Sequence, residues 1–105
     1  MTDSMPLPRP IHLSELAPLV GTTLVAECDP GSVELELVEA SPLVNHAKLD
    51  RPPFILIFRS APAAQLMEGS YVMRGKGFGP DLIYIAQTVT PNTAPPGHYY
   101  QAVFN

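Results

Sequence analysis

The chain has 105 residues, of which 46% are hydrophobic and 15% charged, so it is long enough for one domain with its own core and too apolar for a disordered protein. Six basic and ten acidic residues give a net charge of −4, which offers no attraction to phosphate backbones or anionic lipids and argues against a nucleic-acid or membrane partner. The 13 prolines exclude a helical bundle and favour short strands joined by stiff loops.

The N-terminal residues predict a flexible tail. Residues 1–10 hold three prolines and few side chains that could pack, so residues 11–105 are expected to form a single small β domain. The prolines also interrupt the apolar core that a signal peptide needs, and no stretch approaches the ~20 apolar residues of a membrane span. Cys28 is the only cysteine and cannot form an intrachain disulfide. We therefore expect a cytoplasmic protein.

Residues 11–21 predict the single short helix of the chain. Ser14 is a suitable N-cap, and Gly21 is placed to end the helix. A helix this short is unstable alone and must dock through its apolar side. That side is an apolar stripe at helical spacing, formed by Leu13, Leu16, Leu19 and Val20.

Two segments, 22–28 and 32–40, predict a hairpin. In the second, Val33, Leu35 and Leu37 alternate with glutamates, which is typical of a strand with one face in the core and one in water. The connection contains Pro30 and Gly31, which favour a type II turn whose twist suits hairpin strands poorly, so we expect a connection looser than two residues.

The most apolar stretch is Phe54-Ile55-Leu56-Ile57-Phe58, which ends at Arg59 and is bounded by prolines. The spacing of these prolines allows a strand but is too short for a helix of ordinary length. In a strand, the aromatic and leucine side chains would face one way and the two isoleucines the other. Both faces are therefore apolar, and each needs cover.

Three further strands are predicted downstream. Residues 70–76 and 98–105 alternate, whereas residues 82–89 carry apolar side chains on both faces and are paired here with the Phe54 run. Gly75, Gly77 and Gly79 predict a bulged turn, not a phosphate loop, because a strand follows them. Residues 41–53 and 90–97 are loops by composition.

Six strands with hairpin-like links predict a mainly β fold, either a small antiparallel barrel or a strongly bent sandwich, with one short N-terminal helix. A closed sheet absorbs only one face of each strand. The outward faces of the Phe54 and Leu82 strands then need another cover, for which the N-terminal helix is the first candidate. A second subunit, and hence a homodimer, is the next.

No motif predicts a catalytic, cofactor or metal site. The residues that could bind a metal lack short ligand spacing, namely His12, Cys28, His46 and His98. A long-range site, or a pair of Cys28 with a histidine, stays open but is disfavoured against solvated histidines and a buried thiol. Glu34 and Glu36 could form a carboxylate pair, yet their alternation is that of any solvated strand face.

Five residues remain as candidates for interaction. Arg59 ends the most apolar strand and is expected to pair with Glu15, Asp50 or Glu68 in preference to a ligand. The tyrosines could stack sugars or bases at the barrel rim, although core packing with the hydroxyl at the rim is the commoner arrangement. These tyrosines are Tyr71, Tyr84, Tyr99 and Tyr100.

Four stretches carry a family resemblance: residues 16–21 (LAPLVG), 33–39 (VELELVE), 51–59 (RPPFILIFR) and 100–105 (YQAVFN). They resemble a family of short bacterial proteins catalogued as a domain of unknown function, and the similarity spans residues 13–105. The motifs are structural in type, so the resemblance implies no catalytic residue. It implies an accessory component that accompanies phage-tail-like genes in bacteria.

These observations favour a non-enzymatic module that acts by contact with another protein, as an accessory of a phage-tail-like or other large bacterial structure. The alternative is a barrel that binds a small ligand or a glycan through the rim tyrosines. An enzyme would require a cleft where residues such as His98, Glu34 or Cys28 converge.

Overall fold

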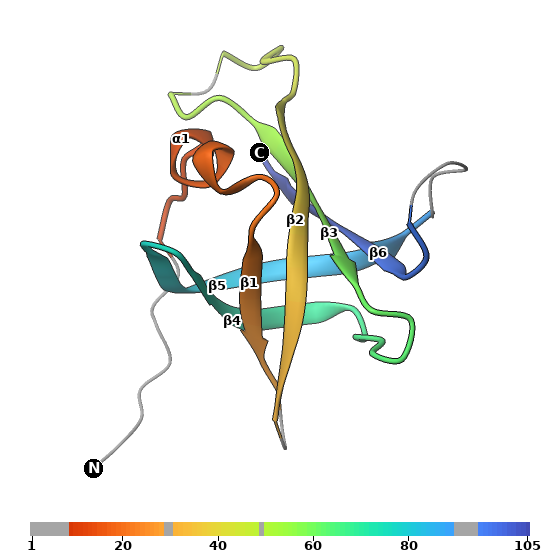
Figure 1. Ribbon diagram of the computed structural model, residues 1–105. Helices are drawn as coiled ribbons and strands as arrows, with labels where there is room; N and C mark the ends of the chain where they lie inside the picture. The colour runs from red at the N-terminus through yellow and green to blue at the C-terminus, as the bar shows by residue number, and fades with distance from the viewer. Residues whose placement is uncertain (1–8, 29–30, 49, 90–94) are drawn as a thin grey trace.

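The structure is a computed structural model that describes residues 9–28, 31–48, 50–89 and 95–105 (Figure 1). An α-helical turn, α1, and a 3-10 turn, η1, come first, and six strands follow. Their bounds are α1 Leu13–Leu16, η1 Ala17–Leu19, β1 Thr23–Glu27, β2 Ser32–Pro42, β3 Phe54–Ser60, β4 Gly69–Gly75, β5 Phe78–Thr88 and β6 His98–Phe104. All six predicted strands are present, and β2 and β5 are longer than their patterns indicated.

The strands close into a barrel in the order β1-β2-β3-β6-β5-β4, with antiparallel neighbours throughout. The chain forms two three-stranded meanders, β1-β2-β3 and β4-β5-β6, which meet at two seams. β3 pairs with β6 along its whole length, whereas only Val25 and Ala26 of β1 pair with β4. The predicted antiparallel barrel is confirmed, and its alternative, the bent sandwich, is wrong. The expected pairing of the Phe54 and Leu82 strands is also wrong, because β6 lies between them.

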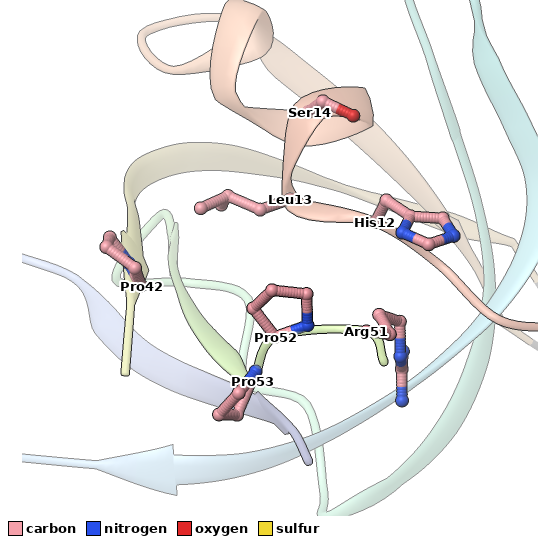
Figure 2. A pocket seen from close by; sticks show the side chains of 7 residues that line it. All are labelled: His12, Leu13, Ser14, Pro42, Arg51, Pro52 and Pro53. Atoms are coloured by element: carbon pink, nitrogen blue, oxygen red, sulfur yellow. The ribbon is translucent and has the colours of Figure 1, made fainter. Parts of the chain in front are cut away.

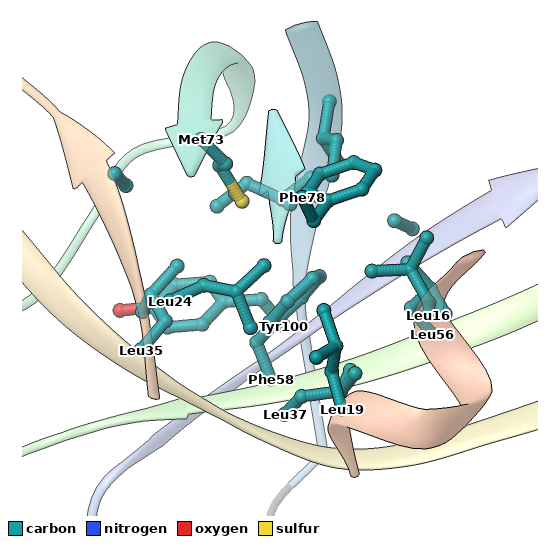
Figure 3. Close-up of a cluster of buried hydrophobic side chains, with 14 of the residues drawn as sticks. Leu16, Leu19, Leu24, Leu35, Leu37, Leu56, Phe58, Met73, Phe78 and Tyr100 are labelled. Carbon is teal, nitrogen blue, oxygen red and sulfur yellow. The ribbon is translucent and has the colours of Figure 1, made fainter. Parts of the chain in front are cut away.

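Strand β3 shows how the alternating pattern becomes a core. Phe54, Leu56 and Phe58 point into the barrel and are completely buried, while Ile55 and Ile57 point outward and are half-buried, so the prediction for the faces of this strand is confirmed. Figure 3 shows inward side chains from several strands meeting in one cluster. The interior is filled by these side chains, which include Leu24, Leu35, Leu37, Met73, Phe78, Ile83, Ile85 and Tyr100.

The predicted helix over residues 11–21 is shorter in the structure, and Ser14 is not its cap. His12 is the N-cap residue of α1, and the Glu15 carboxylate accepts a hydrogen bond from the His12 backbone N–H at 2.9 Å. The α-helix ends at Leu16 and continues as a 3-10 turn, because Pro18 has no N–H to continue the helical hydrogen bonds. Val20, expected on the apolar stripe, lies beyond the last turn and is 43% exposed.

The two helical turns close one mouth of the barrel. Leu16 and Leu19 are buried in the same cluster as the inward side chains of the strands, and Figure 1 shows α1 beside the ends of β1 and β2. The expectation that this helix covers the outward faces of the Phe54 and Leu82 strands is therefore wrong. A closed barrel leaves its interior exposed at the mouth, and Leu16 and Leu19 are buried there.

The connections follow the turn chemistry of the sequence. β4 ends at Gly75 and β5 begins at Phe78, with a register shift between Met73 and Gly75, so the predicted bulged turn is confirmed. Residues 61–68 form no helical turn; the Ala64 N–H donates to the Ala61 carbonyl at 2.9 Å in a simple turn.

Three predictions concern segments that are only partly described. The tail of residues 1–8, residues 29–30 of the first connection and residues 90–94 of the last loop lie outside the described residues. Arg9, assigned to the flexible tail, lies against the domain. Its guanidinium pairs with Asp81 at 2.8 Å and with Glu15 at 2.6 Å, which ties the chain entry to β5 and α1.

Candidate functional site

Arg59 is fixed by the protein itself. Its Nε donates to the carboxylate of Glu36 at 3.1 Å and its Nη1 donates to the carbonyl of Pro96 at 2.9 Å. The prediction that Arg59 pairs with a carboxylate is right, but the partner is none of the three expected residues. Glu36 is the partner because β2 and β3 are neighbours in a register that places it opposite Arg59. Glu34 lines the same shallow hollow, so the two carboxylates that were considered as a pair, and disfavoured, have an arginine beside them.

Three of the tyrosines fasten the β3–β4 connection, residues 61–68. Tyr71 donates its hydroxyl hydrogen to the Met67 carbonyl at 2.7 Å, and Tyr84 donates to the Glu68 carboxylate. The hydrogen bond to Glu68 is the main cause that raises the pKa of Tyr84 above its usual value, and partial burial raises it further. Tyr100 lies inside the barrel, where its hydroxyl accepts from the Leu66 N–H at 2.9 Å.

The fourth tyrosine, Tyr99, is buried on the outer side of β6, where its hydroxyl donates to the Pro95 carbonyl at 2.7 Å. Among the four, only Tyr84 is largely exposed, at 55%. All four hydroxyls therefore bond to the protein. The tyrosines hold loops in place, and the structure does not gather them into an open stacking platform.

Replacing Tyr100 by phenylalanine is expected to lower the free energy of unfolding by about 1–3 kcal/mol, because the buried Leu66 N–H and the buried Ser60 hydroxyl each lose a partner. Urea denaturation measures the change. Tyr99→Phe is the control: its hydroxyl makes one part-buried bond, so a loss of about 0.5–1.5 kcal/mol is expected. Equal losses for the two variants would contradict a special role for the buried cluster.

The residues considered for metal or nucleophilic chemistry lie apart. The thiol of Cys28 is half-buried and contacts the Ala26 carbonyl at 3.7 Å, and the ring of His98 bonds to a loop carbonyl at 3.1 Å. His12 and His46 are exposed on other segments. Within the described ranges, no three histidine, cysteine, aspartate or glutamate side chains gather as metal ligands would.

A surface that the sequence did not predict lies where α1 meets the β2–β3 loop, residues 43–53. A hollow of about 240 Å³ lies there. Figure 2 shows Leu13 and Pro42 on one side of it, His12 and Arg51 on the other, and a proline pair between them. Its lining residues are His12, Leu13, Ser14, Pro42, Arg51, Pro52 and Pro53. The hollow is mainly apolar, with one cation at its edge.

A second hollow of about 230 Å³ adjoins the first across Pro53. Leu43 and Val44 contribute exposed apolar side chains to it, and Val44 is 73% exposed. The loop is held in place by a backbone hydrogen bond of 2.9 Å from the Leu43 N–H to the Pro53 carbonyl. Its lining residues are Leu43, Val44, Asn45, His46, Ala47, Pro53 and Asn105. The two hollows together are called the Pro53 surface below.

The six strands and the first hollow lie within one matched region, and among the lining residues of the second hollow Asn105 alone falls outside it. The family model described as a domain of unknown function, DUF6916, matches residues 11–104. The chain belongs to this family. The family resemblance inferred from the sequence is confirmed. No curated protein and no solved structure matches this DUF6916 domain. None of the helices among its described residues has the length and apolar character needed to cross a membrane.

The sequence of the DUF6916 domain held one signal for the Pro53 surface. Leu43 and Val44 are adjacent large apolar residues inside a segment that is otherwise a loop by composition, and Pro52 and Pro53 stiffen its return. If these side chains only stabilised the fold, they would be buried, whereas here they remain accessible to solvent. The position of Pro52 beside α1 could not be inferred, because Leu13 and Pro52, which line the same hollow, are some 40 residues apart in the chain.

Proposed function

We propose that this domain is a non-enzymatic protein-interaction module that binds its partner through the Pro53 surface. The observation that carries the proposal is the grouping of exposed apolar side chains, Leu43 and Val44, with stiff prolines at one end of the barrel. Rigid apolar patches bordered by polar groups are typical of protein-binding sites. A pre-ordered loop also binds with a smaller loss of conformational entropy than a flexible one.

Binding of a small molecule or glycan, the alternative, has less support. The barrel interior is filled by side chains such as Phe58 and Tyr100, which are completely buried. Ligand sites for small molecules commonly enclose about 300–1,000 Å³. A hollow of about 380 Å³ beside Met67 is open to solvent and is also lined by Gln65, Leu66, Glu68 and Gln87.

Within this proposal the partner is a protein of a larger bacterial assembly, and the domain acts in the cytoplasm as an accessory factor. The net charge of −4 supports a protein partner over nucleic acid. Self-association is a specific version of the same function, because the apolar residues of the Pro53 surface could meet those of a second copy.

The test is affinity capture from the source cells with two matched variants. Val44→Asp places a charge on the Pro53 surface, whereas Val89→Asp changes a valine that is 85% exposed and lies outside it. We expect wild type and Val89→Asp to capture a stoichiometric protein partner. Val44→Asp should capture at least tenfold less of this partner, because a buried unpaired charge costs several kcal/mol.

Light scattering of the purified protein distinguishes self-association from a different partner. A concentration-dependent dimer that Val44→Asp abolishes would identify a second copy as the partner. Equal capture by all three proteins would overturn the proposal, as would the absence of both a stoichiometric partner and a concentration-dependent dimer.

A further inference from the structure

Arg51 differs from the other arginines of the chain in its partners. Three arginines form ion pairs with carboxylates, namely Arg9 with Glu15 and Asp81, Arg59 with Glu36, and Arg74 with Glu27. Arg51 donates at 2.9 Å to the Ile11 carbonyl and at 3.5 Å to the main-chain oxygen of Asn105, the last of the 105 residues, and forms no ion pair with a carboxylate side chain within the described part of the chain. Its positive charge is therefore not neutralised by a side chain of this part of the protein.

The nearest candidate acid on α1 is already engaged. Glu15 follows directly on the residues that line the hollow, but its carboxylate accepts from Arg9 and from the His12 N–H. The hydrogen bond from the Arg9 guanidinium is the main cause that lowers the pKa of Glu15 to about 2, and the bond from the His12 backbone N–H also lowers it. Glu15 is thus engaged with Arg9 and does not pair with Arg51, and the Arg51 guanidinium retains donors for another carboxylate.

The apolar side of the hollow lies directly beside this cation. Figure 2 shows the Arg51 side chain next to Pro52, with Leu13 and Pro42 farther along the hollow. A volume of about 240 Å³ is smaller than a typical site for a drug-sized ligand and suits one or two side chains of a peptide. The hollow thus offers an apolar site for a side chain, with the Arg51 guanidinium beside it.

We infer that this hollow binds an extended acidic segment of the partner protein, with an apolar side chain among Leu13, Pro42 and Pro52 and an adjacent aspartate or glutamate paired with Arg51. The inference rests on the proposed function and names the chemistry of the partner. A guanidinium can hold a carboxylate through two parallel hydrogen bonds, which fixes both the distance and the direction of the segment. The apolar contact supplies desolvation beside that pair.

The probe is a set of acetylated, amidated ten-residue peptides built on glycine and serine. Each carries one aspartate and one leucine, valine or proline at one to three positions on either side of it, and a paired peptide carries asparagine in place of aspartate. Binding to the purified protein is measured by fluorescence polarisation and mapped by amide NMR shifts of residues 12–14 and 50–54.

We expect the best aspartate peptide to bind about 10- to 100-fold more tightly than its asparagine pair, the range given by a charge-assisted hydrogen bond. Arg51→Met should weaken the aspartate peptide by a similar factor and leave the asparagine peptide within twofold. Arg74→Met removes the same charge from a residue on β4 outside the hollow and should change neither. This double comparison isolates the contact between the two charges.

Loss of the Arg51 bond to Ile11 could unfold the variant, so thermal melting is recorded first. If Arg51→Met does not fold, the aspartate and asparagine comparison on wild type, with Arg51→Lys as the second variant, still decides the matter. Arg51→Lys keeps the charge but not the paired geometry, and should weaken the aspartate peptide by less than Arg51→Met.

Equal binding of aspartate and asparagine peptides would overturn the inference, as would saturable binding of acetyl-aspartate amide with the affinity of the best peptide. If Val44→Asp abolishes partner capture while the peptides show no acidic preference, the proposed function stands and this inference fails. If neither experiment gives the expected result, both fail.

Discussion

Replacing Leu56 by alanine is expected to lower the free energy of unfolding by about 2–5 kcal/mol, one of the two largest effects predicted for this domain. Leu56 is completely buried on the inward face of β3, in the cluster that fills the barrel. Its truncation removes apolar contacts and leaves a cavity that a closed six-stranded barrel cannot collapse, because each strand is held on both sides by hydrogen bonds. Urea or thermal denaturation measures the loss.

Ile57→Ala is the matched control for this prediction. Ile57 is the next residue of the same strand and an isomer of leucine, but it points outward and is half-buried. Its truncation exchanges less apolar area and leaves no enclosed cavity, so we expect about 1 kcal/mol. A loss for Ile57→Ala equal to or larger than that for Leu56→Ala would show that the outward face of β3 is buried by something else, such as a second copy of the chain.

Gly79→Ala is expected to prevent stable folding or to cost several kcal/mol. Gly79 has a φ of +83°, and a Cβ atom added there would lie 2.3 Å from the Met73 carbonyl oxygen and 3.0 Å from the Cα of Arg74. Both contacts are with backbone atoms of β4, so they cannot be relieved by a change of rotamer. The β4–β5 pairing would have to open at the residue that precedes Pro80 and Asp81, close to the ion pair with Arg9.

Gly77→Ala separates backbone conformation from crowding. Gly77 has a similar φ of +80°, but an added Cβ would meet nothing within 4 Å. The left-handed conformation alone costs an alanine about 1–2 kcal/mol. Gly77→Ala is therefore expected to fold with that modest loss in urea denaturation. Two variants of equal stability would contradict the close approach of Gly79 to β4.

The local chemistry of the sequence predicted the strands well. The alternation of Phe54 to Phe58 predicted which side chains share a face, and the glycines at 75–79 predicted the position of the tight turn. Both features depend on residues that are neighbours in the chain, where the two-residue period of a strand and the conformational freedom of glycine apply directly. The family resemblance also rested on these local motifs, and the match over residues 11–104 confirms it.

The candidate site was predicted less well. Arg59 and the four tyrosines were chosen as residues with chemistry to offer, yet each is engaged within the protein: Arg59 with Glu36, and the tyrosine hydroxyls with loop carbonyls, the Glu68 carboxylate or the Ser60 and Leu66 cluster. The partner of Arg59 depends on the register between β2 and β3, which local sequence does not specify. Arg51, by contrast, looked like an ordinary loop residue.

By itself, the sequence determined the strand segments, which side chains share a face of each strand, and the all-β class, because side-chain alternation and turn residues act over a few positions. Only the tertiary structure decided the strand order, the closure of the barrel by α1 and η1, and the meeting of α1 with the β2–β3 loop at the Pro53 surface. These features arise where segments far apart in the chain bury apolar surface together. The packing of apolar surface between distant segments, not local propensity, placed Leu16 in the barrel mouth and left Arg51 beside an apolar hollow.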